Sequence, residues 1–212
     1  MKLEDFILNE LKGSIMLTGK KGSGKTLSAT LIAYILYKHG WKIYANYHLN
    51  FDYTAIDKLS VIQNAQEGLL IVDEAYQWLD SRRSSSSKNV LITTLLAKAR
   101  KNKIRVLLLA QYAITIDLRY RIDADWWIQT YIYDVKSLED GTLIPTALLW
   151  EVYTRDAIGE WEEYGQFVIK IPQWLLELYD TNADIFSIED DVNVKQKKEK
   201  TSKKRKKKKS KR

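Results

Sequence analysis

The chain has 212 residues, of which 45% are hydrophobic, and it contains no cysteine. This composition suits one large domain with appendages, and the lack of cysteine excludes disulfides, thiolate catalysis and cysteine-ligated metals. The net charge of +7 does not describe most of the chain, because residues 195–212 alone hold 13 Lys and Arg against one Glu. Residues 1–194 hold 21 basic and 26 acidic side chains, a net charge of −5, so nucleic-acid contact would need a local patch or the basic end.

We therefore expect a folded domain over residues 1–194 and a disordered Lys/Arg-rich tail over residues 195–212. The sequence shows no signal-peptide pattern at its N-terminus, and no apolar run reaches the roughly 18 residues that span a bilayer. These features are typical of an intracellular protein without a membrane span.

Short apolar runs alternate with helical patterns along the chain. We expect helices at 1–12, 26–39, 53–58, 89–103 and 172–179, and a loop at 81–88. We expect strands at 14–18, 41–47, 68–74, 104–110, 125–133, 146–153 and 166–171. This alternation predicts an α/β fold of three layers with a central, mainly parallel sheet, which the last strands continue as a C-terminal β-hairpin extension.

Residues 19–26 join the first strand to the first long helix and read Gly-Lys-Lys-Gly-Ser-Gly-Lys-Thr. They fit G-x-x-x-x-G-K-[ST], the Walker A loop of P-loop NTPases, in which glycines let several N–H groups turn toward one anion. Lys25 can reach the β- and γ-phosphates, and the Thr26 hydroxyl can ligate Mg²⁺. The predicted nucleotide contacts are Gly19, Lys20, Lys21, Gly22, Ser23, Gly24, Lys25, Thr26 and Leu27.

Two acidic residues, Asp73 and Glu74, end the apolar run of the strand at 68–74. The carboxyl end of a parallel strand is where α/β proteins bind ligands, so this pair is a Walker B candidate. Asp73 would support Mg²⁺, and Glu74 would activate the water that attacks the γ-phosphate. Alternatively, the two acids only cap the following helix.

Gln111 ends the next buried strand, where its amide can contact the γ-phosphate or the attacking water. It is otherwise an ordinary polar residue at a strand end. Arg119 and Arg121 follow within ten residues, and an arginine from a neighbouring subunit can stabilise the transferring phosphoryl group. The alternative for either arginine is a salt bridge with Asp117, Asp123 or Asp125.

Basic residues in two segments and in the tail are candidates for DNA contact, because phosphates need only cations within reach. The segment candidates are Arg82, Arg83, Lys98, Arg100 and Lys101. The alternatives are a solvated loop for the first two, a solvated helix end for the other three and a solubilising appendage for the tail.

The order of these landmarks resembles the Zot-like (zonular occludens toxin-like) ATPases of the FtsK–HerA group. The likeness covers residues 15–133 and includes the P-loop, Asp73-Glu74-Ala75, Gln111, the Asp-x-Arg-x-Arg sequence and a second strand that ends in Asn46. It implies a RecA/FtsK–HerA-like, additional-strand sheet in which the Asp-Glu strand and the Gln strand adjoin the P-loop strand. Asn46 carries over as a position without a role.

The resemblance also implies a homo-oligomeric ring that moves double-stranded DNA in virus assembly or genome packaging. The relatives from filamentous phages usually continue into a membrane segment, which this sequence lacks, so a soluble motor in the host cytoplasm is expected. It could associate with the virion through a capsid protein. The alternative hypotheses are an ATP-dependent assembly or replication-initiation protein and a P-loop kinase for a small molecule.

Overall fold

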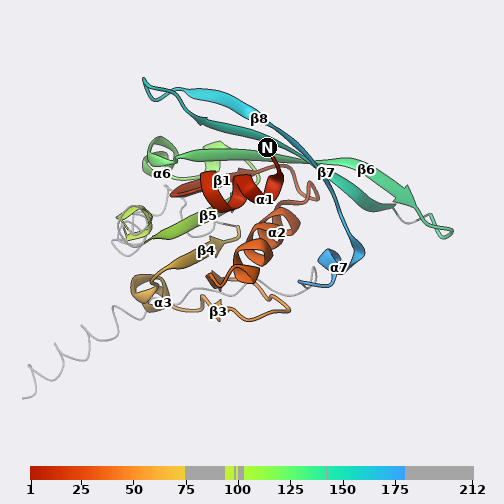
Figure 1. Cartoon of the computed structure of the whole chain (residues 1–212), viewed down its shortest axis with the longest axis horizontal. Helices are drawn as coiled ribbons and strands as arrows, with labels where there is room; N and C mark the ends of the chain where they lie inside the picture. The colour runs from red at the N-terminus through yellow and green to blue at the C-terminus, as the bar shows by residue number, and fades with distance from the viewer. Residues whose placement is uncertain (75–93, 98, 100–102, 142, 180–212) are drawn as a thin grey trace, which may run out of the picture.

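The structure is a computed structural model that describes residues 1–74, 94–97, 99, 103–141 and 143–179 (Figure 1). Several predictions concern residues outside these ranges. They are the loop at 81–88, the DNA candidates Arg82, Arg83, Lys98, Arg100 and Lys101, and the tail at 195–212. Residues 94–97 and 99, within the helix expected at 89–103, are helical.

A single sheet organises the described residues, with strand order β3-β2-β4-β5-β1-β6-β7-β8. Its strands are β1 (Ser14–Thr18), β2 (Lys42–Ala45), β3 (Thr54–Ala55), β4 (Gly68–Val72), β5 (Ile104–Ala110), β6 (Trp126–Ser137), β7 (Leu143–Arg155) and β8 (Trp161–Lys170). All neighbours from β3 to β6 pair in parallel, and β7 and β8 add antiparallel strands. The predicted α/β class, the mainly parallel sheet and the hairpin extension are confirmed.

Helices cover the two faces of the sheet (Figure 1). On one face lie the N-terminal helix pair α1 (Leu3–Asp5) and a π-helix (Phe6–Glu10), with α2 (Lys25–Lys38) beside them. On the other lie α3 (Leu59–Asn64) and α6 (Leu118–Asp123). Strands β1, β4 and β5 are buried at every position, as expected for strands covered on both sides.

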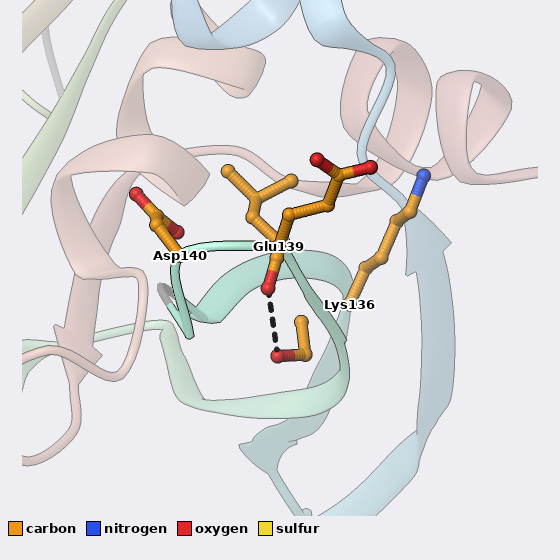
Figure 2. Close-up of a pocket in the computed structure, with 5 residues that line it drawn as sticks. Lys136, Glu139 and Asp140 are labelled. Carbon is orange, nitrogen blue, oxygen red and sulfur yellow. Dashed lines mark hydrogen bonds between the residues drawn. The ribbon is translucent and has the colours of Figure 1, made fainter.

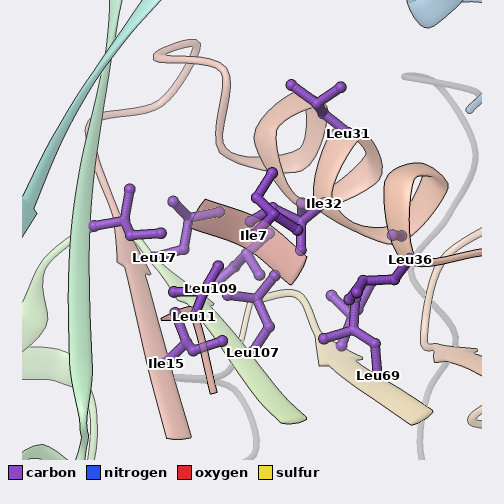
Figure 3. Close-up of a cluster of buried hydrophobic side chains, with 14 of the residues drawn as sticks. Ile7, Leu11, Ile15, Leu17, Leu31, Ile32, Leu36, Leu69, Leu107 and Leu109 are labelled. Carbon is purple, nitrogen blue, oxygen red and sulfur yellow. The ribbon is translucent and has the colours of Figure 1, made fainter. Parts of the chain in front are cut away.

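The first face holds the larger hydrophobic cluster. Figure 3 shows side chains of the π-helix and α2 meeting those of the central strands, among them Ile7, Ile32, Leu17 and Leu107. Because α2 lies between the sheet and further apolar segments, it buries residues around most of its circumference. A short helix near the C-terminus, α7 (Gln173–Leu176), begins after Pro172 and also packs beside α2.

The N-terminal arm is tied to the sheet by a buried arginine. Arg105 in β5 donates hydrogen bonds to the carbonyls of Ile7 and Leu8, the latter at 2.7 Å, and its guanidinium lies 4.3 Å from the Trp41 ring centre. Burial lowers the pKa of Arg105 to about 10, so the group stays charged at neutral pH. Phe6 stacks on Phe167 with ring centres 5.0 Å apart. The N-terminal helix pair therefore packs on the sheet as an arm held by Arg105 and Phe6.

Two expectations about the elements are wrong, and one helix was missed. The helix expected at 53–58 is replaced by β3 and α3, because Thr54 and Ala55 pair with β2 and the Ile56 N–H bonds the Ala45 carbonyl at 2.8 Å. Helix α6 was not expected at all. The Asp-Glu strand β4 does not adjoin the P-loop strand β1, because the Gln strand β5 lies between them. None of the helices in the described ranges is long and apolar enough to cross a bilayer.

Candidate nucleotide-binding site

The sequence-predicted site residues converge at the carboxyl edge of three adjacent parallel strands. The P-loop leaves β1 after Thr18, Asp73 follows β4, and Gln111 follows β5. The register aligns Thr18 with Ala110, so the P-loop and Gln111 begin side by side. This is the edge where ligands bind in open α/β sheets.

The P-loop backbone needs glycine at two positions. Gly24 caps the N-terminus of α2 with φ +87°, and a Cβ atom there would lie 2.5 Å from Leu148 Cδ2. A Cβ atom on Gly19 would lie 2.3 Å from Ser23 Oγ and 2.6 Å from the Thr130 carbonyl oxygen. The backbone of β6 leaves no room for a side chain at Gly19, and at Gly24 the left-handed φ favours glycine beside the close Leu148 side chain.

Lys25 folds back over the loop that precedes it. Its ammonium group donates to the carbonyls of Gly19 at 2.9 Å and Lys20 at 3.0 Å. Burial lowers the pKa of Lys25, and the nearby carboxylates of Asp73 and Glu74 act against that shift. The Lys25 ammonium and the two carboxylates therefore share one electrostatic environment.

Thr26 and Asp73 are joined directly across the site. The Thr26 hydroxyl donates to Asp73 Oδ2 at 2.7 Å, and the Glu74 N–H donates to Asp73 Oδ1 at 2.7 Å. Burial raises the pKa of Asp73, although both hydrogen bonds and Lys25 favour its charged form. A bound cation would offset the cost of burying the ionised carboxylate.

Thr26 and Asp73 are also suitable in chemistry for Mg²⁺, which prefers oxygen ligands and usually keeps waters and substrate phosphates in its coordination shell. The described residues contain no cluster of three or more acidic or histidine side chains that could hold a metal alone. Nucleotide phosphates would complete the coordination that these two residues begin.

Asn46, at the end of β2, holds the backbone of Asp73. The Asp73 N–H donates to Asn46 Oδ1 at 2.7 Å, and Asn46 Nδ2 donates to the Asp73 carbonyl at 3.0 Å. Asn46 is fully buried. Sequence reasoning assigned it no role, although a polar residue directly after a buried strand was a usable signal.

The other P-loop positions differ in exposure. Lys20 and Lys21 are exposed, whereas Leu27 is buried in the core, so it can offer a ligand only its backbone N–H. Glu74 is partly exposed and has a left-handed backbone with φ +50°. Gln111 is also partly exposed, directly after β5.

Both arginine candidates lie on α6, which packs on the second face of the sheet. Arg119 forms a two-point pair with Asp117, with Nε to Oδ1 at 2.9 Å and Nη2 to Oδ2 at 3.0 Å. Arg121 Nε donates to the Ile116 carbonyl at 3.0 Å. The salt bridge named as the alternative for these arginines thus exists for Arg119.

The hairpin extension has a hollow of its own at the turn between β6 and β7 (Figure 2). Its lining comes from the single segment Lys136–Asp140, in which the Ser137 hydroxyl donates to the Leu138 carbonyl at 3.3 Å. None of the sequence-predicted site residues line it. We therefore place the functional site at the P-loop and not at this hollow.

No protein-family model and no curated protein sequence matches the chain. Among solved structures, the N-terminal domain of zonular occludens toxin from Neisseria meningitidis matches with a TM-score of 0.51 and 17% identity, over 80% of this chain and 100% of that one. The flagellar accessory protein FlaH from Methanocaldococcus jannaschii matches with a TM-score of 0.51 and 12% identity, over 80% and 91%. The genome packaging NTPase B204 from Sulfolobus turreted icosahedral virus 2 matches with a TM-score of 0.48 and 16% identity, over 77% and 99%.

The chain has the fold of the P-loop NTPases. The match to the zonular occludens toxin domain confirms, for the fold, the likeness to Zot-like proteins that the sequence predicted.

Proposed function

We propose that this chain is a Mg²⁺-dependent ATPase that translocates DNA in viral genome packaging or virion morphogenesis. One observation carries the ATPase part: the hydrogen bond of 2.7 Å between the Thr26 hydroxyl and Asp73 Oδ2. It brings a P-loop hydroxyl and a strand-end carboxylate together, 47 residues apart in sequence, beside the Lys25 ammonium. Phosphoryl transfer uses this combination of groups.

The chain's own residues would divide the work of hydrolysis. The P-loop N–H groups and Lys25 bind phosphate oxygens at the N-terminus of α2. Magnesium held by Thr26 and Asp73 would neutralise charge on the phosphates. Glu74 orients a water molecule and accepts its proton, and the Gln111 amide contacts the γ-phosphate or that water. Arg119 or Arg121 of a neighbouring subunit stabilises the transferring group.

The DNA part of the proposal rests on the resemblance of the motif order to DNA-moving motors. A homo-oligomeric ring would supply both the arginine in trans and a central path for double-stranded DNA. The proposed phosphate contacts are Arg82, Arg83, Lys98, Arg100, Lys101 and the tail at 195–212, which lie outside the described residues. A capsid or other virion protein is the further partner that packaging would require.

The test is the variant Glu74→Gln. Loss of the general base should reduce Mg²⁺-dependent ATP turnover by at least about 100-fold, while ATP still binds. Glu67→Gln is a matched control, because Glu67 also has a positive φ and precedes β4 at the opposite end of that strand. We expect wild-type turnover from Glu67→Gln. Unchanged hydrolysis by Glu74→Gln would refute the assignment.

The response of ATP hydrolysis to double-stranded DNA distinguishes the remaining functional hypotheses. A translocase should hydrolyse ATP faster with DNA and move along it. Hydrolysis without stimulation or movement would favour an assembly or replication-initiation protein. Phosphate transfer to a small acceptor, with little hydrolysis in its absence, would favour a kinase.

A further inference from the structure

The antiparallel extension forms the wall behind the nucleotide loop. Gly19 lies against the carbonyl of Thr130 in β6, and Gly24 lies against the side chain of Leu148 in β7. Thr130 and Leu148 both come more than a hundred residues after the loop in the sequence. The shape of the P-loop therefore depends on elements that carry none of its motif.

A chain of buried hydrogen bonds crosses this contact. Trp150 Nε1 lies 2.8 Å from Ser28 Oγ, Ser28 Oγ lies 3.2 Å from Thr130 Oγ1, and Thr130 Oγ1 lies 3.2 Å from the Ser23 carbonyl oxygen. The Trp150, Ser28 and Thr130 side chains are fully buried. Because buried polar groups are costly without partners, this series of hydrogen bonds holds all three side chains in one orientation.

The chemistry of the groups sets the direction of the chain. An indole N–H can only donate, so Ser28 accepts from Trp150. The Ser23 carbonyl can only accept, so the single Thr130 proton is directed to it. Ser28 must then donate to Thr130. Each hydroxyl gives one hydrogen bond and receives one, and the last acceptor is the P-loop backbone.

The Ser23 carbonyl belongs to the peptide unit that it shares with Gly24. In a trans peptide the C=O and the following N–H point in opposite directions. A carbonyl held toward β6 therefore turns the Gly24 N–H away from β6. Within the described part of the chain this N–H has no acceptor.

We propose that Thr130 is a positioning residue for nucleotide binding. By holding the Ser23 carbonyl, it directs the Gly24 N–H toward the phosphates, and Ser28 and Trp150 keep Thr130 in the orientation that does so. This inference rests on the proposed nucleotide site at the P-loop and deepens it. It assigns to the hairpin extension a part in the affinity for phosphate.

The test compares Thr130→Val, which keeps the shape of the side chain but removes the hydroxyl, with Thr130→Ser, which restores it. The affinity for ADP and for pyrophosphate is measured by calorimetry, well below each variant's Tm. We expect about tenfold weaker binding for Thr130→Val, equivalent to about 1.4 kcal/mol, and affinity within about twofold of wild type for Thr130→Ser. The KM for ATP should rise in parallel, with kcat little changed.

Thr154→Val is the matched control, since Thr154 lies on the neighbouring strand β7 and its hydroxyl bonds the Asp125 carbonyl at 3.4 Å, outside the loop. A purely structural role of Thr130 would lower the Tm of Thr130→Val but leave the affinity of the folded variant equal to that of Thr154→Val and wild type. Should Thr130→Val not fold, Thr130→Cys provides the comparison, because a thiol is a weak donor and intermediate affinity is expected.

Wild-type affinity in Thr130→Val, or in Thr130→Cys where the valine variant does not fold, would overturn the inference and leave the proposed function intact. So would an equal loss in Thr130→Val and Thr130→Ser. Failure of the wild-type protein to bind either ligand would overturn both.

Discussion

The side-chain amide of Asn46 continues the hydrogen bonding between β2 and β4 beyond the last pair of backbone groups. The two strands pair in parallel up to Ala45 and Ile71, and the Asn46 amide then meets both the N–H and the carbonyl of Asp73, at 2.7 and 3.0 Å. The amide thus holds the backbone from which the Asp73 carboxylate reaches Thr26. Asn46 therefore fixes the acid through its backbone, and neither of these hydrogen bonds involves the Asp73 carboxylate.

Replacing Asn46 by Ala should destabilise the protein and impair the site together. The change leaves two buried backbone groups of Asp73 without partners, so we expect the free energy of unfolding to fall by about 2–4 kcal/mol. Urea unfolding measures that loss, and Mg²⁺-dependent ATP turnover measures the effect on the site. Asn50→Ala is the control, because Asn50 is exposed and should lose less than about 1 kcal/mol. Equal stability of the two variants would contradict the role given to Asn46.

The buried carboxylate of Asp73 predicts an unusual pH dependence of stability. Burial raises its pKa, so at pH values just above 3.8 the folded protein holds a proton that the unfolded chain has released. Its contribution to stability therefore decreases as the pH rises from 3.8 through the raised pKa. Asp73→Asn carries no such group, and without nucleotide or Mg²⁺ we expect its Tm at pH 7 to exceed that of wild type.

The expected gain for Asp73→Asn is about 2–4 °C, which corresponds to about 1 kcal/mol in a domain of this size. Thermal unfolding between pH 4 and pH 8 tests it, and the difference from wild type should narrow toward pH 4. A lower Tm for Asp73→Asn across this whole range would show that the hydrogen bonds from Thr26 and Glu74 outweigh the burial of the charge.

The elements that were predicted well carry their signal in consecutive residues. The strands β1, β4 and β5 are uninterrupted apolar runs, and the P-loop is a contiguous motif between a strand and a helix. The acidic pair and Gln111 follow such runs directly, and so their edge of the sheet could be inferred. Local sequence was enough for these features because neighbouring residues determine them.

The features that were missed depend on contacts between distant residues. The apolar runs do not indicate which strand lies between two others, so the position of β5 between β1 and β4 could not be predicted. The contact of Thr130 with Ser23 joins residues 107 positions apart. Helix α6 has six residues, too few for a clear period, although Asp117 at its N-cap was a local signal.

Arg105 should prove to be the main anchor of the N-terminal arm. Arg105→Met keeps much of the apolar stem but leaves the carbonyls of Ile7 and Leu8 without their donor. We expect a loss of about 1–3 kcal/mol in stability and faster amide hydrogen exchange in the π-helix. Arg105→Lys should give an intermediate result, because an ammonium cannot reproduce the planar fork. Wild-type exchange in Arg105→Met would refute the anchor.

Asp117 should stabilise α6 in a way that depends on its charge. The two-point pair with Arg119 lowers the pKa of Asp117, so its contribution is present above an ordinary aspartate pKa and is lost as the pH falls through the lowered value. Asp117→Asn keeps a capping oxygen for the Arg119 N–H but removes the charge. At pH 7 we expect it to cost about 0.5–1 kcal/mol, and Asp117→Ala about 1 kcal/mol more through the lost cap. Urea unfolding at pH 7 and pH 2.5 measures the free energy of unfolding of each variant. At the lower pH the stability of Asp117→Asn should approach that of wild type, whereas part of the deficit of Asp117→Ala should persist. A deficit for Asp117→Asn that is the same at both pH values would mean that the charge contributes nothing.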